Sequence, residues 1–548
     1  MSTSRAFSYR MSDGYKKLHV FRETVSKFPQ NTFIAVPSAK DRDYYESGFE
    51  LSYTEALKQV DLVKGKLLNA GYGVGDRVAL ALDNRPEHIV YKLALNSLGI
   101  SCVPVNPDYR SAELSYLLEH SESALIIYLK KHEEKVVEAQ TLINKSIKLW
   151  CFDGKEKKIP TLRNIQVKGD INSQTETSLL YTSGTTGRPK GCRLSNQYEL
   201  MTGAWYAELG GMSSMRFGHE RVFNPLPLYH VNAGIVSLLG MILLGGCQIQ
   251  PDRFHPKTFW NDAISTRATI IHYLGVVAPM LLNQPQDPIE RAHFIRFGLG
   301  AGVEPGLHKV FENRFGFPLI EIWGMTEMVR VLAANKNPRK RGTRAMGRPV
   351  PGLEVEVRDE RDNKVPFGVT GEMVVRYSSK TPRLGSFLGY LKDDEATENA
   401  WRGGWFHTGD SVYQAEDGML HFVDRIKNII RRSGENIAAA EIEGVLQECD
   451  QVAQVAVIPV PDSIREEEVL ACIVPADGIV PDEELAKILF DYCNEKLSYF
   501  KVPAWFNFRP ELPKTGSQKI QKHMIFDKNI DPEKVEGMID FRSLKRRS

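Results

Sequence analysis

Hydroxyl, glycine and lysine side chains crowd into one stretch of this chain, residues 181–191, which reads YTSGTTGRPKG. Glycine accepts backbone angles that other residues resist, so successive N–H groups can point into one concave cradle. Short hydroxyl donors and one ammonium suit an anion with several oxygens. The stretch therefore predicts a polyphosphate-binding loop made by Thr182, Ser183, Gly184, Thr185, Thr186, Gly187 and Lys190.

Glycine, serine, threonine and proline are also ordinary turn residues, so a solvated turn between strands is the plainer alternative. The loop is not a Walker A motif, because Pro189 precedes the lysine and the glycine spacing differs. The run is longer than a turn requires, and it resembles the phosphate loop of the adenylate-forming superfamily. That superfamily includes acyl-CoA synthetases, luciferases and the adenylation domains of peptide synthetases. The resemblance implies that the loop holds the β- and γ-phosphates of ATP.

Two further stretches resemble nucleotide motifs of this superfamily: residues 298–302 (GLGAG) and residues 321–327 (EIWGMTE). The resemblance implies that Trp323 packs on adenine and that Thr326 contacts the α-phosphate or the substrate carboxylate. It also implies that Glu327 helps to hold Mg²⁺, a cation that prefers oxygen ligands. The implied nucleoside-binding residues are Gly300, Ala301, Gly302, Glu321, Ile322, Trp323, Gly324, Asp410 and Arg425.

Asp410 closes a Thr-Gly-Asp motif, and Arg425 follows fifteen residues later. One carboxylate can accept hydrogen bonds from both hydroxyls of a ribose, which fits Asp410. The resemblance implies that Arg425 contacts the ribose and phosphate side, where a planar cation with several donors suits oxygen ligands.

Near the C-terminus, residues 512–522 read LPKTGSQKIQK, and the resemblance identifies Lys519 as the catalytic lysine. Lys514 and Lys522 are competing candidates, since an exposed lysine normally belongs only to the surface. Gln518 stands where the superfamily usually has glycine, a form that resembles ligases for carnitine and crotonobetaine. The resemblance also implies a hinge at Lys427 and contacts to coenzyme A from Arg431 or Arg432 and from Ser433 and Gly434.

A turn at residues 225–230 reads PLPLYH and ends on His230. A lone histidine is more often structural than catalytic. In this context it resembles the aromatic-histidine turn that lines the acyl site of the superfamily, which implies a catalytic role. Aromatic residues nearby could line that site or fill the core, and the core is the safer expectation: Trp205, Tyr206, Tyr229 and Tyr273.

The elements that must position these residues alternate between strand and helix. Apolar runs at 77–82, 102–105 and 124–128 predict buried strands, and periodic segments at 56–70, 89–98 and 111–120 predict helices. We therefore expect an α/β fold: a large N-terminal domain of layered sheets and helices over 1–426, and a small mobile α+β domain over 427–548. Strands at 455–460 and 469–474 and a helix at 483–497 would build the small domain.

Composition excludes several classes. The net charge of +2 gives no general case for nucleic-acid binding, and seven cysteines without paired spacing argue against disulfides and zinc. The start of the chain has no apolar signal segment, so the cytoplasm is the expected location. Residues 231–249 are mostly apolar, but four glycines and several polar residues favour a buried helix and strand over a membrane span.

Two smaller expectations concern surfaces. A basic cluster of residues 339–341 and Arg344 is expected to be a solvated loop, with a contact to a phosphate of coenzyme A as the alternative. A homodimer is one assembly open to such a chain, and the sequence does not select it.

The resemblance as a whole implies an ATP-dependent acid–CoA ligase. A small carboxylic acid would react with MgATP to give an acyl adenylate and pyrophosphate, and coenzyme A would then take the acyl group and release AMP. The acid is expected to be small and polar, or to carry a trimethylammonium group. The alternatives are a fatty or aromatic acid–CoA ligase, an enzyme that loads a carrier protein, and a catalytically silent homologue that only binds.

Overall fold

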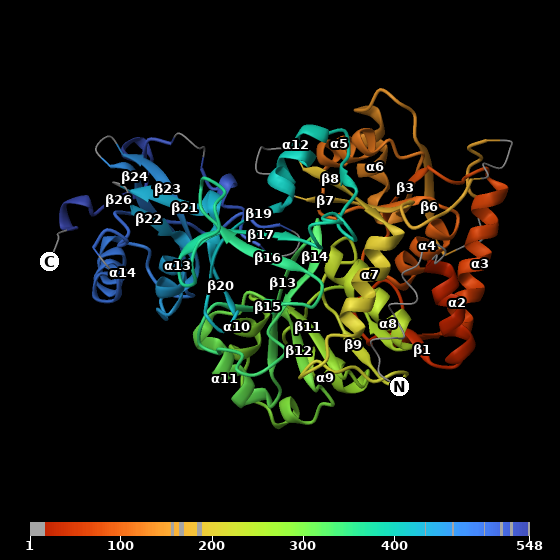
Figure 1. The fold of residues 1–548 in the computed structure, drawn as a ribbon, viewed down its shortest axis with the longest axis horizontal. Coiled ribbons are helices and arrows are strands. Elements are labelled where there is room, and N and C mark those ends of the chain that lie inside the picture. Colours follow the sequence, from red (N-terminus) through yellow and green to blue (C-terminus); the bar gives the residue numbers. More distant parts are fainter. Residues whose placement is uncertain are drawn as a thin grey trace. The chain divides into compact units, whose positions relative to one another are not determined.

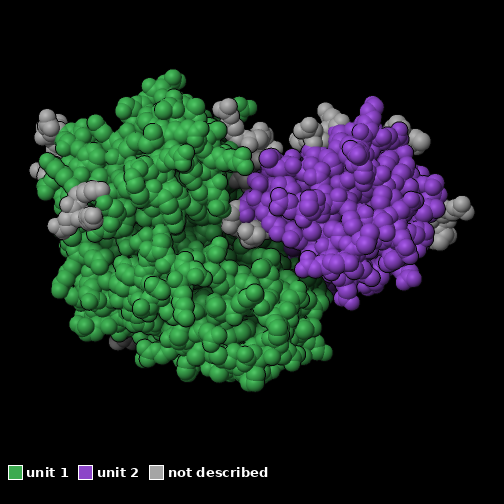
Figure 2. Space-filling model, turned by 180° about the vertical axis from the view of Figure 1, so that it is seen from behind, with its two compact units in different colours: residues 1–354, 376–406 green, residues 355–375, 407–548 purple. Residues whose placement is uncertain are grey.

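The computed structural model describes residues 17–154, 158–163, 169–182, 189–432, 435–462, 465–497, 499–515, 519–526 and 530–545. The chain forms two compact units, drawn in green and purple in Figure 2. Unit 1 holds residues 1–354 and 376–406, and unit 2 holds residues 355–375 and 407–548. The expected α/β architecture with a large first part and a smaller second part is confirmed, whereas the domain boundary at residue 426 stays a prediction.

The first sheet of unit 1 has the strand order β18-β8-β7-β4-β3-β5-β6. Strands β3, β4, β5, β6 and β7 run parallel, and their apolar side chains are buried, as expected for a sheet covered on both faces. β8 returns antiparallel to β7. The bounds are β3 (Arg77–Ala81), β4 (Ser101–Pro104), β5 (Leu125–Leu129), β6 (Lys148–Phe152), β7 (Glu176–Thr182), β8 (Lys190–Ser195) and β18 (Gly389–Tyr390).

Helices between these strands follow the predicted spacing. Ser52 caps α3, because its side chain accepts a hydrogen bond from the N–H of Glu55, whose carboxylate bonds back to the N–H of Ser52. The predicted helices and strands of this region are confirmed within a few residues at each end. The helix bounds are α2 (Lys17–Lys27), α3 (Tyr53–Asn69), α4 (Pro86–Ser97), α5 (Ser111–Ser121) and α6 (Glu133–Thr141).

A second sheet in unit 1 has the order β15-β14-β13-β12-β11-β9-β10-β1-β2 (Figure 1). Its strands from β13 to β1 run parallel to one another. The bounds are β1 (Thr32–Val36), β2 (Phe49–Ser52), β9 (Arg221–Phe223), β10 (Cys247–Ile249), β11 (Ile270–Leu274), β12 (Phe297–Ala301), β13 (Leu319–Met325), β14 (Met328–Ala333) and β15 (Ala345–Pro349).

Helices cover both faces of this sheet. On one face Phe223, Ile271 and Tyr273 share a buried apolar cluster with residues of α9 (Phe259–Ser265), α10 (Val277–Leu282) and α11 (Pro305–Phe315). On the other face, α7 (Asn196–Ala207) packs against α8 (Leu238–Leu244), as Figure 1 shows. Unit 1 also contains α12 (Asp394–Ala400).

A buried charge cluster joins three helices of unit 1. Glu199 of α7 lies 2.7 Å from the ammonium of Lys17 and 3.4 Å from that of Lys92, which lie on α2 and α4. The side chains are almost fully buried. The two lysines lower the pKa of Glu199 to about 2 in spite of its burial, which by itself would raise it.

The mostly apolar segment of residues 231–249 is confirmed as a buried helix followed by a buried strand. It begins with a π-helical turn, Asn232–Ser237, continues as α8 and returns as β10. In the part of the chain that the structure describes, no helix has both the length and the apolar character to cross a membrane.

Unit 2 contains two sheets. The first has the strand order β16 (Glu354–Arg358), β17 (Thr370–Arg376), β19 (Phe406–Gln414) and β20 (Leu420–Arg425), with β19 antiparallel to β20. The second has the order β22-β21-β24-β25-β26, with β23 paired to β24. Helices α13 (Ala439–Gln447) and α14 (Glu483–Lys496) contribute to its apolar core. The bounds are β21 (Ile429–Arg432), β22 (Glu435–Ala438), β23 (Val452–Asp462), β24 (Glu466–Pro475), β25 (Trp505–Phe508) and β26 (Met538–Asp540).

Candidate nucleotide and acid site

The predicted phosphate loop joins the antiparallel strands β7 and β8. Thr182 and Lys190 pair across the base of this connection. Five of its predicted residues lie outside the described part of the chain, namely Ser183, Gly184, Thr185, Thr186 and Gly187. The loop therefore starts at the carboxyl end of β7, which runs parallel to β4. α/β sheets bind phosphates at the carboxyl ends of their parallel strands.

Lys190 and Glu327 meet the same aromatic residue, Tyr390. The ammonium of Lys190 lies 5.0 Å from the centre of the Tyr390 ring and 3.3 Å from a carboxylate oxygen of Asp393. The Tyr390 hydroxyl donates a hydrogen bond of 2.8 Å to Glu327. Neither Tyr390 nor Asp393 is among the site residues expected from the sequence. Tyr390 thus contacts both Lys190, a cation suited to phosphate oxygens, and Glu327, a carboxylate suited to a divalent ion.

Glu327 is only 5% exposed, and Thr326 before it is held by a hydrogen bond of 2.8 Å from the Tyr198 hydroxyl to its carbonyl. Cys192 is buried nearby. Burial first and the charge of Glu327 second raise the pKa of its thiol well above the ordinary value, so Cys192 stays neutral. Cys192 therefore adds no charge beside the carboxylate of Glu327.

A magnesium ion that also binds phosphate oxygens needs only one or two protein carboxylates. Among the described residues, no group of three or more histidine, cysteine, aspartate or glutamate side chains could hold a metal by itself. The buried carboxylate of Glu327, oriented by the Tyr390 hydroxyl, fits a magnesium site in which phosphate oxygens supply most of the ligands. It does not fit a metal site made by protein side chains alone.

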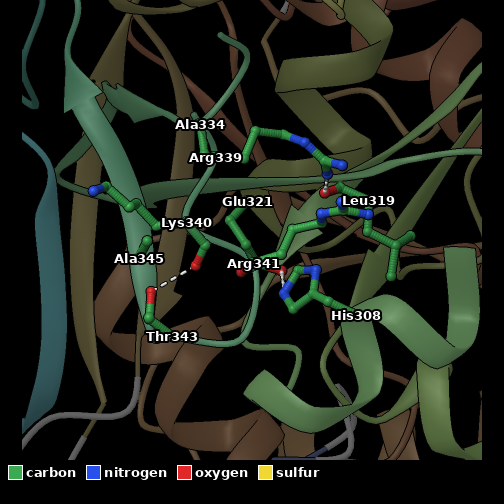
Figure 3. Close-up of a pocket in the computed structure, with 9 residues that line it drawn as sticks. All are labelled: His308, Leu319, Glu321, Ala334, Arg339, Lys340, Arg341, Thr343 and Ala345. Atoms are coloured by element: carbon green, nitrogen blue, oxygen red, sulfur yellow. Dashed lines mark hydrogen bonds and ion pairs between the residues drawn. The ribbon is translucent and has the colours of Figure 1, made fainter. Parts of the chain in front are cut away.

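Glu321 links the two predicted nucleoside stretches. Its carboxylate accepts hydrogen bonds from the N–H of Gly302 at 2.8 Å and from the Tyr273 hydroxyl at 2.9 Å. His308 lies 3.5 Å away, and the two side chains point toward each other in Figure 3. Burial raises the pKa of Glu321 to about 7 and lowers the pKa of His308 to about 4, so the imidazole is neutral and supplies no counter-charge.

The hollow beside this carboxylate has room for only about 10 Å³, which is one water molecule and not an adenine ring. The remaining predicted nucleoside residues of unit 1 follow the same strands. Gly300 and Ala301 end β12, and Ile322, Trp323 and Gly324 belong to β13, with Trp323 only 7% exposed. The structure therefore brings the GLGAG and EIWGMTE stretches together at neighbouring strand ends.

In the basic cluster of residues 339–341 and Arg344, the expected solvated loop is wrong for one residue. The Arg339 side chain is 8% exposed and lies 2.7 Å from Glu312, so a solvated position is the wrong interpretation for it. Arg341 pairs with the same carboxylate and Arg344 with Glu304. Lys340 and Arg341 are exposed, as expected. The sequence alone does not reveal these ion pairs, because α11 brings Glu312 to the loop only in the folded chain.

The turn that ends on His230 leads directly into the π-helical turn. The His230 carbonyl accepts a hydrogen bond of 2.9 Å from Gly234, and the Tyr229 and His230 rings lie 4.6 Å apart. Both residues are half-buried, as is Trp205. Tyr206 and Tyr273 are fully buried, so the core expectation is confirmed for them.

In unit 2, Asp410 and Arg425 are opposite neighbours on β19 and β20. The Arg425 Nε atom lies 2.7 Å from Asp410 Oδ1, and the Asp410 side chain is 1% exposed. Lys519 lies within electrostatic range of both. Desolvation first and the charge of Arg425 second lower the pKa of Lys519, while Asp410 acts in the opposite direction. The structure thus brings these three predicted residues into one charge system.

The competing lysines differ from Lys519 in their surroundings. The Lys522 ammonium lies 2.8 Å from Glu443, which neutralises it, and Lys514 pairs through its backbone with Ile520. Among the predicted contacts to coenzyme A, Arg432 is buried against Glu468 at 2.8 Å, so its charge is already satisfied. Ser433 and Gly434 lie outside the described residues, as do the side chains of Arg431 and Lys427.

Hydrogen bonds of Asp424 span the position of the predicted hinge. One carboxylate oxygen accepts from the Asn428 side chain at 3.1 Å, and the other accepts from the N–H of Ala440 at 2.8 Å. Both bonds therefore connect Asp424, which precedes the 3₁₀ turn at Lys427, to residues that follow Lys427.

Comparisons with known proteins identify the family of this chain. The model of the AMP-binding enzyme family matches residues 21–391, and that of the AMP-binding enzyme C-terminal domain matches residues 441–519. A probable CoA ligase, CCL9, of Humulus lupulus is 32% identical over 87% of this chain and 91% of the relative. A crotonobetaine/carnitine–CoA ligase of Citrobacter koseri is 29% identical over 86% of this chain and 92% of that protein.

Solved structures share the fold. The anthranilate CoA ligase AuaEII, in complex with anthranoyl-AMP, superposes with a TM-score of 0.80 at 20% identity over 93% of this chain and 96% of that one. ATP-bound MatB from Rhodopseudomonas palustris gives a TM-score of 0.77 at 24% identity, over 92% and 97% of the two chains. The family motifs follow one another in order along the chain, and the model of the AMP-binding enzyme family matches more than half of it. The chain therefore belongs to the family of AMP-binding enzymes, in the acyl-CoA ligase branch of the adenylate-forming superfamily.

Proposed function

We propose that this protein is an AMP-forming acid–CoA ligase. The observation that carries the proposal is the meeting of Lys190 and Glu327 at Tyr390, although 137 positions separate the two charged residues in the chain. A lysine for the phosphates beside a buried carboxylate for a divalent ion is the charge arrangement that a magnesium nucleotide needs.

In the first step, a carboxylate oxygen of the acid forms a bond to the α-phosphorus of ATP, and the bond to pyrophosphate breaks. Both reactants are anionic, so catalysis depends on alignment and on cations that offset their repulsion. Lys190 serves the leaving phosphates, Lys519 serves the carboxylate and the α-phosphate, and Thr326 contributes a hydroxyl donor. Mg²⁺ held at Glu327 would supply further positive charge to the phosphate oxygens.

In the second step, the sulfur of coenzyme A forms a bond to the acyl carbon and AMP leaves. Asp410 and Arg425 hold the ribose side of the nucleotide in this proposal, and Glu321 belongs to the adenine side. His230 is proposed to face the acyl group. Arg431, Ser433 and Gly434 remain the proposed contacts to coenzyme A, since Arg432 is engaged by Glu468.

The acid is proposed to be small and polar, including acids with a trimethylammonium group. Relatives named crotonobetaine/carnitine–CoA ligase, 27–29% identical over 86–87% of the chain, support this class. Aromatic faces can attract a quaternary ammonium. We further propose that the enzyme works in the cytoplasm, which suits its seven free cysteines.

The experiment that tests the proposal measures AMP release by the purified protein with MgATP and a panel of acids, with and without coenzyme A. The panel contains carnitine, crotonobetaine and short-chain, medium-chain and aromatic acids. Release that needs coenzyme A is expected with small polar acids. Release that ignores coenzyme A would instead favour an enzyme that loads a carrier, and ATP binding without turnover of any acid would favour a silent homologue.

A further inference from the structure

The order of strands in the second sheet of unit 1 reverses at β9. The chain passes from β9 to β10 on one side and then crosses to β11 on the other side of β9. Crossovers in parallel sheets are right-handed, so the connections that leave β9 and β11 lead to opposite faces of the sheet. Ligands of open parallel sheets bind beyond the carboxyl ends of the strands at such a reversal. Asn224 and the π-helical turn after β9 lie at this edge.

A chain of buried amides and hydroxyls follows this edge, and backbone groups determine the direction of its hydrogen bonds. The N–H of Leu226 donates to Asn224 Oδ1 at 3.1 Å, so the other end of that side chain is its NH₂ group. This group donates to Ser237 at 2.9 Å and to Asn232 Oδ1 at 3.0 Å. The amide oxygen of Asn232 is therefore directed into the network.

His272 gives the same direction from the other side. Burial lowers the pKa of His272 to about 3, so the ring is neutral and carries one N–H. Its Nδ1 atom lies 2.6 Å from Asn232 Oδ1, and its Nε2 atom lies 2.8 Å from the Tyr206 hydroxyl. The contact from Nδ1 to Asn232 Oδ1 is much shorter than the 3.3 Å contact from the Asn224 NH₂ group to the same nitrogen, so Nδ1–H is assigned as donating to Asn232 and Nε2 as accepting from Tyr206.

Glutamine side chains complete the chain and are also oriented by carbonyl groups. Gln250 donates to the carbonyls of Asn224 and Leu226 at 3.0 Å each. Gln248 donates to Gln250 at 2.9 Å and accepts from Ser237 at 3.0 Å. Every member except Asn232 is fully buried: Tyr206, Asn224, Ser237, Gln248, Gln250 and His272.

Asn232 is the half-buried end of this network. Its Oδ1 atom accepts two hydrogen bonds from inside, and its NH₂ group meets no acceptor among the residues that the structure describes. It also begins the π-helical turn, two residues after His230. Such turns are rare and occur frequently at functional sites.

The π-helical turn is held in place by its surroundings. The buried ammonium of Lys92 donates to the Gly234 carbonyl at 3.0 Å. A side chain at Gly234 would bring a Cβ atom within 2.3 Å of the Leu228 carbonyl oxygen, so only glycine fits this packing. The position of Asn232 is therefore determined by packing on both sides.

We propose that the NH₂ group of Asn232 is a substrate-selecting hydrogen-bond donor, and that the acid this enzyme activates carries a second oxygen that accepts this bond. The inference rests on the proposed ligase function and deepens it. The accepting group is a hydroxyl, a carbonyl or a second carboxylate on a short acid. An amide NH₂ cannot attract an ammonium, so a cationic group of the acid lies elsewhere.

The test uses pairs of acids that differ by one oxygen group: carnitine and γ-butyrobetaine, 3-hydroxybutyrate and butyrate, and 4-oxopentanoate and pentanoate. The readout is the ratio of kcat/KM within each pair, from AMP release with MgATP and coenzyme A. For at least one hydroxyl pair and for the keto pair, we expect the wild-type enzyme to prefer the oxygen-bearing acid about tenfold, the usual scale of one hydrogen bond.

Two variants separate donation from simple damage. Asn232→Leu removes the donor, so both kinds of preference should fall to about one. Asn232→Asp keeps the inward oxygen but replaces the outward NH₂ with an acceptor; it should lose the preference for the keto acid and retain much of that for the hydroxy acid, because a hydroxyl can also donate. Asn144→Asp, at an exposed position after α6, is the matched control and should keep wild-type ratios.

The outcomes distinguish this inference from the function on which it rests. CoA-dependent turnover with ratios near one in the wild-type enzyme, or with ratios unchanged in both Asn232 variants, would overturn the inference and leave the ligase standing. A parallel loss of activity for both members of every pair would also overturn it, since it reports structural damage only. No acid-dependent AMP release and no exchange of pyrophosphate into ATP would overturn the ligase proposal, and the inference with it.

Discussion

Asp410 and Arg425 face each other across β19 and β20, and only 2.7 Å separates Asp410 Oδ1 from Arg425 Nε. The carboxylate is buried, whereas the arginine side chain is 39% exposed. A buried carboxylate is costly without a counter-charge, so Arg425 both stabilises the fold locally and leaves part of its guanidinium open to a ligand. The pair therefore joins stability to nucleotide binding.

The first prediction is that Asp410→Ala weakens ATP binding about 10- to 100-fold, the scale of hydrogen bonds to a charged group. Isothermal titration with ATP measures the affinity. Arg425→Ala should in addition lower the free energy of unfolding by about 1–3 kcal/mol, because it leaves a buried carboxylate without its partner. Unchanged ATP affinity in Asp410→Ala would reject the ribose contact.

A second prediction concerns the two half-reactions. Lys519→Ala should reduce formation of the acyl adenylate by at least about 100-fold, because it removes a cation from the charge system of Asp410 and Arg425. It should spare thioester formation from a supplied acyl adenylate. Pyrophosphate exchange and single-turnover thioester assays measure the two steps.

Lys514→Ala and Lys522→Ala are the controls for this experiment. Lys522 is neutralised by Glu443, and its loss should cost no more than a partly exposed ion pair, about 1 kcal/mol or less. Equal loss of both half-reactions in Lys519→Ala, or a larger effect from Lys514→Ala, would argue against the assignment of Lys519.

The third prediction is a pH dependence of stability that comes from Glu321. Its pKa is raised from 4.5 in the unfolded chain to about 7 by burial, so the folded state holds the proton more tightly. The resulting stabilisation is complete below pH 4.5 and is lost as the pH rises to about 7. Its size is on the order of 3 kcal/mol.

Urea denaturation of the wild-type protein and of Glu321→Gln, at several pH values, measures this contribution as a difference. The advantage of the wild-type protein over the variant should shrink between pH 4.5 and 7 and stay constant above that range. Parallel curves for the two proteins across this range would show that Glu321 does not hold its proton in the folded state.

A fourth prediction tests the orientation of Glu327. Tyr390→Phe removes the hydroxyl that donates to this buried carboxylate at 2.8 Å and keeps the ring beside Lys190. Because partners of metal ligands orient them, the Mg²⁺ concentration for half-maximal activity should rise about 10-fold or more. Tyr72→Phe is a control, since its hydroxyl donates to the carbonyl of Pro160 and not to Glu327. An unchanged Mg²⁺ requirement would separate Tyr390 from the metal.

Much of the fold could be predicted from local patterns. The strand at β3 and the helix at α3 follow from an apolar run and a capping box, which depend on neighbours in the chain. The buried helix and strand after His230 were also predictable, because glycines and polar residues interrupt the apolar run. The π-helical start was not, since it depends on Lys92 and on the close approach to Leu228.

The site was predictable as motifs and not as a geometry. Resemblance identified Lys190 and Glu327, but the role of Tyr390 between them arises because β18 pairs with β8. The burial of Arg339 against Glu312 likewise depends on a long-range contact between a loop and α11. Motif spacing could not reveal the Asn232 network, whose members come from α7, the π-helical turn and three neighbouring strands or strand ends.

The hydrogen-bond network that ends at Asn232 also affects how the preference for an acid can change during evolution. Each amide direction depends on the next, so a substitution at Gln248 or Asn224 changes the environment of Asn232 without touching the acid. Lineages that acquire a new substrate are therefore expected to exchange several of these buried residues together. Covariation among positions 224, 232, 237, 248 and 272 would then mark branches of the family by the polarity of the acids they use.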